Sequence, residues 1–321
     1  MNMEITKIVT VSPRGFCAGV ARSIKVVEDC LTIFGTPIYI KHAIVHNKTV
    51  VADLEAKGAI IVEDVADIPE DSVAVFSAHG SPPEHFEQAR KRGINVIDAT
   101  CPLVTKVHIE IARYVRGGKN IVYIGHHGHV EGLGVLGEAE KMGTVVPLID
   151  SIDEVKSLSY PEDQDVVILT QTTLSIEETK KIICAIKEKY PQTIEPPAQD
   201  ICYATTNRQG AIKKLATQVD IVLIVGSQTS SNSNRLVEVA CDAGADAYLL
   251  DSVEEIDEGW LVGKDAVGLS AGASAPEYKV QEIIQYFIDR GAQHTDLEAA
   301  EEHMTFTEPA ELTKARKENS K

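Results

Sequence analysis

Three cysteines of this chain occupy the same kind of position, directly after a strand pattern and directly before a helix pattern. They are Cys17, Cys101 and Cys202, separated by 84 and 101 residues. Thiolates bind metals, and the free N–H groups and the dipole at a helix N-terminus lower the pKa of a thiol. Because cysteines so far apart cannot form a local metal-binding motif, they share a metal only if similar units bring them to one point. The spacing therefore predicts a metal cluster held by three separate domains.

Isolated free cysteines are usually small buried hydrophobic residues. This interpretation suits Cys30, Cys184 and Cys241, which lie inside helix patterns. The other three cysteines share one placement, which favours a cluster. Iron–sulfur clusters usually have four thiolate ligands. Three would leave one iron of a 4Fe–4S cluster open, where it can activate a substrate as a Lewis acid.

Two polar turns follow each of these three cysteines at similar offsets. The first turn lies 28 or 29 residues after the cysteine, and the second lies 62 to 72 residues after it. In chain order the first turns hold His46, His129 and Ser230, and the second turns hold His79, Thr172 and Ser274. Ligands of open α/β sheets bind at the carboxyl ends of strands. Three such rims facing inward would form a cavity with thiols at its floor.

The turn at Ser230 has the composition of an anion-binding site. The segment GSQTSSNSNR lies between a strand pattern and a helix that starts near Asn232. Hydroxyl and amide side chains at a helix N-terminus bind phosphate, although plain N-capping explains the same residues. The imidazoles of His46, His79 and His129 in the other turns favour a diphosphate site.

Glu131 lies two residues after His129, at the predicted start of a helix. A carboxylate there complements the helix dipole. In a cavity poor in water it would instead have a raised pKa and deliver protons beside the cluster. The hydroxyl groups of Thr172 and Thr173 could relay such protons. A zinc site is the alternative for the histidines of the same turn, which are His126, His127 and His129.

The elements that position these residues follow an α/β pattern, because aliphatic and β-branched runs alternate with helix patterns. Ten runs predict buried strands of parallel sheets: ITKIVTV, TPIYI, GAIIV, SVAVFS, INVIDA, NIVYIG, TVVPLI, DVVILT, DIVLIVG and DAVGLS. The repeat of thiol and polar turns predicts three similar α/β domains. Their expected bounds are 18–101, 102–199, and 1–17 together with 200–290, with 291–321 as a C-terminal strap or tail.

Composition excludes some function classes. The net charge is −17, from 31 basic and 48 acidic residues, which disfavours binding to nucleic acid or to an anionic membrane. No segment approaches the roughly 20 apolar residues of a membrane span. The N-terminus lacks a secretory pattern. We therefore expect a cytoplasmic protein whose six cysteines stay reduced.

Nine segments resemble, in this order, the 4-hydroxy-3-methylbut-2-enyl diphosphate reductase family. They are GFCAGV, VHN, SAHG, DATCPLVTKVH, GHHGHVE, TQTTLS, ICYATTNRQ, SSNSNR and SAGASAP, and the resemblance spans about residues 5 to 310. It implies a pseudo-threefold trefoil of three α/β domains around a central 4Fe–4S cluster. The ligands would be Cys17, Cys101 and Cys202, with the fourth iron open.

The resemblance also implies roles for the polar residues. Those that would bind the diphosphate are His46, His79, His129, Ser230, Ser231, Asn232 and Ser274. Thr172 would lie near the substrate hydroxyl, and Glu131 would deliver protons. We also expect Thr172 and Thr173 to contact the substrate. Family members bind an allylic alcohol at the open iron, take up two electrons and protons, and lose water. The products are isopentenyl and dimethylallyl diphosphate, in the last step of the methylerythritol phosphate pathway.

One stretch departs from the family pattern. The family sequence His-Pro-Glu-Val is replaced by His129-Val130-Glu131-Gly132. Because proline fixes φ and glycine loosens a turn, we expect Glu131 to be held less firmly, which affects turnover and the product ratio. No GxGxxG fingerprint follows a strand, so a ferredoxin or flavodoxin is the expected electron donor rather than NAD(P)H.

Two other function classes share some of these features. A quinolinate synthase-like or dehydratase-type lyase would use the same open iron but would not consume electrons. An iron–sulfur sensor or carrier would be non-enzymatic. A fourth cysteine ligand would favour a sensor or carrier, whereas a phosphate site of substrate size argues against it.

Overall fold

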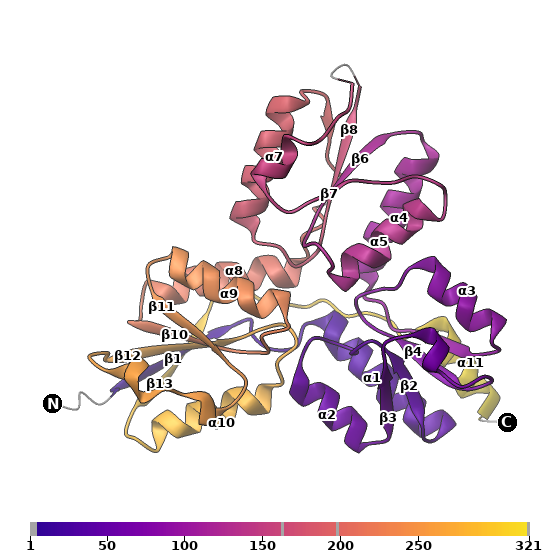
Figure 1. Cartoon of the computed structure of the whole chain (residues 1–321). Helices are drawn as coiled ribbons and strands as arrows, with labels where there is room; N and C mark the ends of the chain where they lie inside the picture. Colours follow the sequence, from indigo (N-terminus) through magenta and orange to yellow (C-terminus); the bar gives the residue numbers. More distant parts are fainter. Residues whose placement is uncertain (1–4, 162–163, 197–198, 320–321) are drawn as a thin grey trace. The chain divides into compact units, whose positions relative to one another are not determined.

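Three parallel sheets with helices between their strands make up the fold (Figure 1). The computed structural model describes residues 5–161, 164–196 and 199–319. Within these residues every strand pairing is parallel, which confirms the predicted α/β class. No helix in the same residues is long and apolar enough to cross a membrane.

The first sheet has the strand order β3-β2-β4-β5. Its strands are β2 (Ile38–Lys41), β3 (Ala59–Val62), β4 (Val73–Phe76) and β5 (Asn95–Asp98). The helical segments of this part are α1 (Ala18–Phe34), α2 (Lys48–Ala56), the 3-10 helix η1 (Val65–Asp67) and α3 (Pro83–Lys91). Ala74 and Phe76 of β4 pack against Ala89 of α3 in the core.

The second sheet has the order β7-β6-β8-β9. Its strands are β6 (Asn120–Ile124), β7 (Leu148–Ile149), β8 (Val166–Thr170) and β9 (Thr193–Ile194). Its helices are α4 (Pro102–Arg116), α5 (Val130–Glu140), α6 (Ile152–Val155) and α7 (Ile176–Lys189). Successive residues of β8 enter two core clusters in turn, Val166 and Ile168 in one, Val167 and Leu169 in the other. Burial of both faces explains the continuous apolar run.

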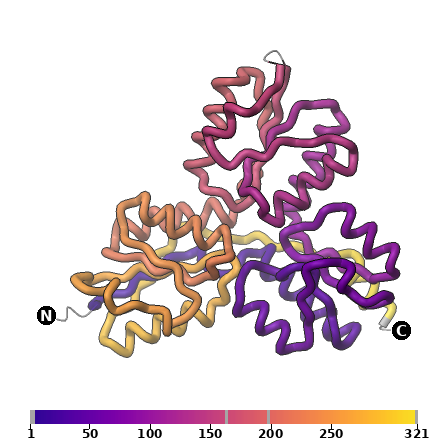
Figure 2. The backbone as a smooth tube through the Cα atoms, in the orientation of Figure 1, coloured from indigo at the N-terminus to yellow at the C-terminus, as the bar shows by residue number. Residues whose placement is uncertain are grey.

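The third sheet has the order β11-β10-β12-β1-β13. Its strands are β1 (Lys7–Ser12), β10 (Ile221–Val225), β11 (Asp246–Leu250), β12 (Ala266–Ala271) and β13 (Gln293–Glu298). The remaining helical segments are α8 (Tyr203–Ala216), α9 (Ser231–Asp242), η2 (Val253–Glu255), η3 (Glu258–Leu261), α10 (Glu277–Ile288) and α11 (Ala310–Asn319). Figure 2 shows the indigo strand β1 beside the orange and yellow strands of this sheet.

The three sheets share one strand order. In each sheet, four neighbouring strands follow the same sequence of roles. An outer strand comes first, next the strand that precedes the first polar turn, then the strand that precedes the second polar turn, and last the strand that precedes the cysteine. These series are β3-β2-β4-β5, β7-β6-β8-β9 and β11-β10-β12-β1. Since the strands are parallel, each sheet presents its polar turns and its thiol at one edge. The strand order thus agrees with the repeat inferred from the offsets.

Contacts divide the chain into two compact units. One comprises Met1–Val20, His46–Ala52 and Tyr203–Thr305, and the other comprises Ala21–Val45, Asp53–Cys202 and Phe306–Lys321. The domain bounds expected from the sequence stay a prediction. The C-terminal segment, expected as a strap or tail, contributes β13 to the third sheet and ends in α11.

A buried ion pair fastens this C-terminal segment inside the first unit. The side chain of Arg208 on α8 is 1% exposed and donates to both carboxylate oxygens of Glu302, at 2.9 and 3.3 Å. The same guanidinium donates to the carbonyl oxygens of Ala204 and Gly15. Glu302 therefore neutralises the cation that holds the segment leading to Cys17.

We expect Glu302→Ala to lower the free energy of unfolding by about 3 kcal/mol, because it leaves a buried guanidinium unpaired. The matched control is Glu301→Ala, whose exposed carboxylate pairs with exposed His303 and should cost less than about 1 kcal/mol. Urea denaturation of both variants measures the difference. Equal destabilisation would show that the Arg208 pair does not fasten this segment.

Candidate functional site

Each of the three predicted cysteines lies at a strand-to-helix junction. Cys17 precedes α1, Cys101 is the N-cap residue of α4, and Cys202 precedes α8. All three thiols are partly exposed. The placement predicted from the sequence is therefore confirmed for each residue, whereas their role as metal ligands stays a prediction.

The backbone amides of these cysteines make the same hydrogen bond three times. Each donates to a carbonyl oxygen in a second polar turn: Cys17 to Ala273 at 3.2 Å, Cys101 to Ala78 at 3.0 Å, and Cys202 to Thr172 at 3.1 Å. Each thiol is thus fixed beside the turn that holds Ser274, His79 or Thr172. Long-range backbone bonds of this kind set the position of a side chain more tightly than a flexible loop does.

The other cysteines follow the sequence expectation only in part. Cys30 is fully buried, and burial raises the pKa of its thiol to about 12. The expectation of burial is wrong for Cys184 and Cys241, which are exposed on α7 and α9. The buried residues Ile182 and Ile186 of α7 and Val239 of α9 lie two positions from the cysteine of their helix, which puts them on the opposite face. A cysteine inside a helix pattern can therefore still face outward.

Glu131 is the most buried acid of the site, with only 2% of its surface exposed. It is the second residue of α5, whose N-cap residue is His129. The backbone N–H of Thr172 donates to Oε1 at 2.7 Å, and the Thr172 hydroxyl donates to Oε2 at 2.8 Å. Both carboxylate oxygens are therefore held by one residue at the end of β8.

Burial raises the pKa of the Glu131 carboxyl group to about 7. The two hydrogen bonds from Thr172 oppose this effect by stabilising the anion, and the negative charge of Asp200 adds to it. A group whose pKa lies near neutrality is populated in both protonation states and can therefore give or take a proton in a reaction.

Gly132, which stands where the family pattern has valine, lies beside the ring of Tyr123. Gly132 is buried in α5, and a Cβ atom there would lie 3.4 Å from Cε1 of Tyr123. The fully buried tyrosine ring thus fills the space beside the glycine. Both carboxylate oxygens of Glu131 accept hydrogen bonds from Thr172 here, and the expectation that Glu131 is held less firmly than in the family stays a prediction.

Histidines gather beside Glu131 in the same unit. The rings of His79 and His129 have centroids 6.4 Å apart, and the rings of His42 and His79 have centroids 5.8 Å apart. Nδ1 of His129 accepts a hydrogen bond from the Glu131 backbone N–H. A neutral His129 therefore carries its proton on Nε2, as a donor suited to phosphate oxygen. Sequence reasoning missed His42, although it follows β2 directly, at a strand end.

In the other unit, the polar residues of the third sheet form a second group. Ser230 caps α9 by accepting from the Ser233 backbone N–H, so the capping interpretation holds for it. Oδ1 of Asn232 accepts from the Ala273 N–H at 2.8 Å, while its buried Nδ2 has no hydrogen-bond partner among the described atoms. The Ser274 hydroxyl donates to the carbonyl oxygen of His46. A buried unpaired donor at a helix N-terminus suits an anion.

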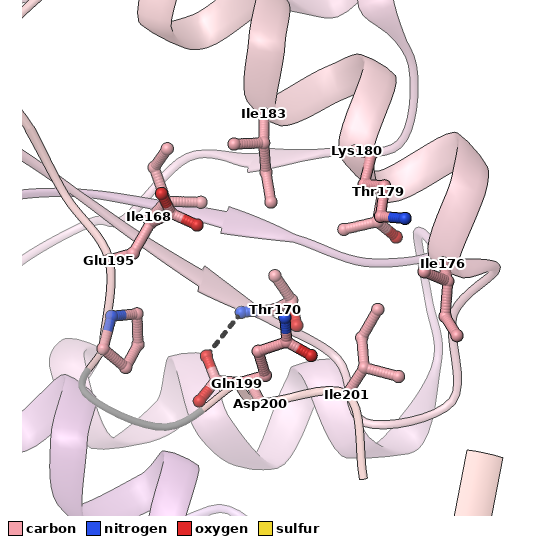
Figure 3. A pocket seen from close by; sticks show the side chains of 11 residues that line it. Ile168, Thr170, Ile176, Thr179, Lys180, Ile183, Glu195, Gln199, Asp200 and Ile201 are labelled. Atoms are coloured by element: carbon pink, nitrogen blue, oxygen red, sulfur yellow. Dashed lines mark hydrogen bonds between the residues drawn. The ribbon is translucent and has the colours of Figure 1, made fainter. Parts of the chain in front are cut away.

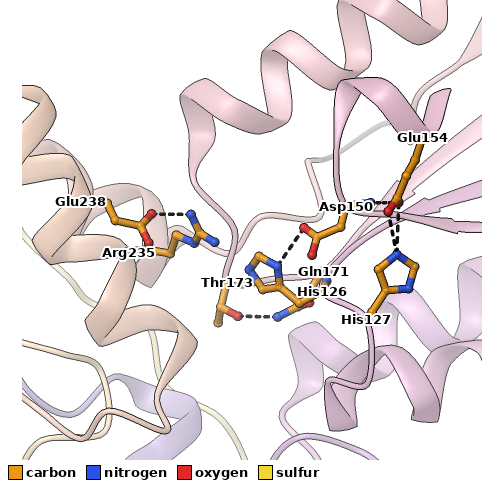
Figure 4. A network of polar contacts seen from close by, with 8 residues as sticks. All are labelled: His126, His127, Asp150, Glu154, Gln171, Thr173, Arg235 and Glu238. Carbon is orange, nitrogen blue, oxygen red and sulfur yellow. Dashed lines mark hydrogen bonds and ion pairs between the residues drawn. The ribbon is translucent and has the colours of Figure 1, made fainter. Parts of the chain in front are cut away.

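The zinc alternative does not fit the histidines before α5. His126 pairs with Asp150 at 2.9 Å, and His127 with Glu154 at 3.1 Å (Figure 4). In the described part of the chain, no three possible ligand atoms that include either imidazole lie within 4.8 Å of one another. These rings therefore form carboxylate pairs.

Thr173 differs from its neighbour Thr172 in what it contacts. Its hydroxyl accepts a hydrogen bond from the side chain of Gln171 at 3.0 Å, and Gln171 also accepts from the His126 backbone N–H (Figure 4). Thr172 is thus the threonine that bonds to Glu131. The fully buried Gln171, which sequence reasoning missed, joins the ends of β6 and β8.

The predicted site residues fall into two groups, one in each compact unit. The first unit holds Cys17, His46, Ser230, Ser231, Asn232 and Ser274, with Ser231 as the first residue of α9. The second unit holds Cys101, His79, His129, Glu131, Thr172, Thr173 and Cys202. Their individual roles in binding and catalysis stay predictions.

Known proteins resemble the chain over nearly its whole length. A family model described as LytB protein matches residues 8–288. A 4-hydroxy-3-methylbut-2-enyl diphosphate reductase from Actinobacillus pleuropneumoniae serotype 7 is 46% identical over 306 residues, which are 95% of this chain and 98% of that protein. One of the same name from Streptomyces avermitilis is 48% identical over 308 residues, or 95% and 90% of the two chains.

Solved structures agree with these matches. The E-1-hydroxy-2-methyl-but-2-enyl-4-diphosphate reductase from Plasmodium falciparum has a TM-score of 0.95 at 36% identity, covering 98% of this chain and 99% of its own. A second reductase structure, described as the terminal enzyme of the non-mevalonate pathway, has a TM-score of 0.65 at 31% identity. The resemblance stated from the motifs is therefore confirmed, and this chain belongs to the LytB family, whose curated members are named 4-hydroxy-3-methylbut-2-enyl diphosphate reductases.

Proposed function

We propose that this protein reductively dehydroxylates 4-hydroxy-3-methylbut-2-enyl diphosphate to isopentenyl and dimethylallyl diphosphate, the last step of the methylerythritol phosphate pathway. Two electrons and two protons enter, the C–O bond breaks, and water leaves. The observation that carries the proposal is the buried Glu131 carboxyl group, because its partner Thr172 also holds the amide of Cys202. An acid with a pKa of about 7 and a cysteine of the predicted cluster thus both bond to Thr172.

We propose that Cys17, Cys101 and Cys202 hold one 4Fe–4S cluster with an open fourth iron site. The three partly exposed thiols at helix N-termini suit this group, since soft thiolates select iron–sulfur clusters and the helix dipole stabilises them. When bound, such a cluster supplies electrons and a Lewis-acidic iron for the substrate hydroxyl. The repeated cysteine amide bond supports a trefoil of three domains with the bounds expected from the sequence.

The diphosphate would bind to the polar turns. We assign it to the imidazoles of the first two sheets and to the hydroxyl and amide groups of the third, namely His46, His79, His129, Ser230, Ser231, Asn232 and Ser274. The unpaired amide Nδ2 of Asn232 supports this assignment, because a phosphate oxygen would satisfy it. So does the acceptor role of His129 Nδ1, which leaves Nε2 to donate.

Glu131 would supply the protons. Its raised pKa keeps part of the population protonated at neutral pH, and Thr172 fixes the direction of the carboxyl group. One proton would convert the leaving hydroxide to water, and one would reach the allylic carbon skeleton. Thr173 would act beside them through its contact with Gln171.

The electron donor and the location follow from the same proposal. Since no GxGxxG fingerprint follows a strand, we propose a ferredoxin or flavodoxin as the donor. Cluster thiolates need a reducing compartment, which favours the cytoplasm. Consumption of reductant distinguishes this reaction from that of a lyase with the same kind of cluster.

The test of this function is anaerobic purification followed by iron, sulfide and turnover analysis. We expect about four irons and four sulfides per chain, and two electrons consumed per product. Cys101→Ser should lose most of the iron, whereas Cys184→Ser, at an exposed cysteine of α7, should keep it. A protein without iron refutes the proposal, and turnover without reductant assigns a lyase instead.

Glu131→Gln should bind substrate with a KM within about threefold of wild type and lower kcat by at least about 100-fold, because the amide keeps the shape but cannot give a proton. Steady-state kinetics with a chemical reductant measure both constants. The control is Glu140→Gln, at an exposed position on the same helix. Near-normal kcat in Glu131→Gln would remove this residue from the mechanism.

A further inference from the structure

We propose that Asp200 and Lys106 are positioning residues. Their ion pair keeps Glu131 and Thr172 at a fixed spacing from the thiols of Cys101 and Cys202. This inference rests on the proposed function, since it assigns the surroundings of Glu131 and the cysteines. Neither residue was singled out from the sequence. Both belong to the second compact unit, as do Thr172 and Cys202.

Asp200 joins two chain segments side by side. Its Oδ2 accepts from the Thr170 backbone N–H at 3.0 Å (Figure 3), and two residues further along both segments Cys202 donates to the Thr172 carbonyl oxygen at 3.1 Å. These two hydrogen bonds link residues 170–172 to residues 200–202 at successive points along both segments. Loss of the hydrogen bond between Thr170 and Asp200 would therefore shift Thr172 and Cys202 relative to each other.

Lys106 ties these segments to a third element. Its Nζ donates to Oδ1 of Asp200 at 2.8 Å, and the two side chains are 28% and 1% exposed. Lys106 lies on α4, whose N-cap residue is Cys101. A further contact joins Nζ to the Gln199 carbonyl oxygen at 3.4 Å. The helix that starts at one thiol is thus fixed to the segment that ends at another.

The surroundings of Asp200 strengthen this pair. A cavity of about 80 Å³ borders the carboxylate and Thr170, with isoleucines from β8, α7 and the segment before α8 in its wall (Figure 3). The Asp200 side chain is 1% exposed, which limits screening by water, so this ion pair is stronger than one at the surface. The negative charge of Asp200 also contributes to the raised pKa of Glu131.

The experiment uses the full-length protein with its reconstituted cluster and compares Asp200→Ala with Asp165→Ala. Asp165 pairs with Lys119 at 2.7 Å just before β8, and both side chains are 40% exposed, which makes it a matched control. We expect Asp200→Ala to speed amide hydrogen exchange at Thr170 and Cys202 at least about tenfold and to lower kcat at least about tenfold. KM should stay within about threefold, and Asp165→Ala should change nothing beyond twofold.

Two further measurements separate positioning from general stability. Because Asp200→Ala removes a negative charge, the pKa of Glu131 falls, so the falling limb of the kcat pH profile should move to lower pH. Lys106→Gln should lower kcat as well, and the double variant should lose no more than the worse single variant. Asp200→Asn keeps one acceptor and should show an intermediate loss.

Wild-type exchange at Thr170 and Cys202 in Asp200→Ala would overturn the proposal, and so would losses that multiply in the double variant. If Asp200→Ala does not fold, Asp200→Asn and Lys106→Gln carry the same test. If the wild-type protein shows no reductase turnover, the proposed function fails. Hydrogen exchange then still decides whether Asp200 positions the two segments.

Discussion

Two hydrogen bonds from Thr172 hold the buried carboxyl group of Glu131 at the carboxyl end of β8. Burial makes the charged form costly, while these bonds favour it, and the balance sets a pKa near 7. The carbonyl oxygen of the same Thr172 fixes the amide of Cys202. The turn at Thr172 therefore positions both the proposed proton donor Glu131 and the cysteine Cys202. Any movement of that turn would affect both residues.

The hydrogen bond between a cysteine amide and a neighbouring polar turn occurs in all three sheets. Three parallel sheets place their strands in the same order, and three cysteine amides donate to the turn on the neighbouring strand. Parallel strands bring residues far apart in sequence to one sheet edge, which lets small polar turns act together. The family relationship supplies the substrate for the proposed function, and the geometry of these turns supplies its chemistry.

Much of this was predictable from the sequence, for physical reasons. Each of the ten apolar runs contains a strand, although in TVVPLI the strand is only Leu148–Ile149. Burial on both faces explains the continuous hydrophobicity of β8 and β10. Strands β9, β11 and β13 were not predicted. Strand β13 is largely exposed and polar, and it joins the sheet through backbone bonds and through contacts of His294 and Asp296 with Thr10. The cysteines and polar turns were predicted from residue type and offset. Asp200 and Gln171 were missed because their roles depend on partners tens of residues away.

The most direct measurement of the central claim is an infrared pH titration of the Glu131 carboxyl group, taken as the difference between wild type and Glu131→Gln. The account predicts a protonated carboxyl band that disappears with a midpoint at about pH 7. A midpoint near 4.5, the ordinary value for a glutamate, would contradict it. In that case the group would be ionised throughout the neutral range and could not serve as the proton donor.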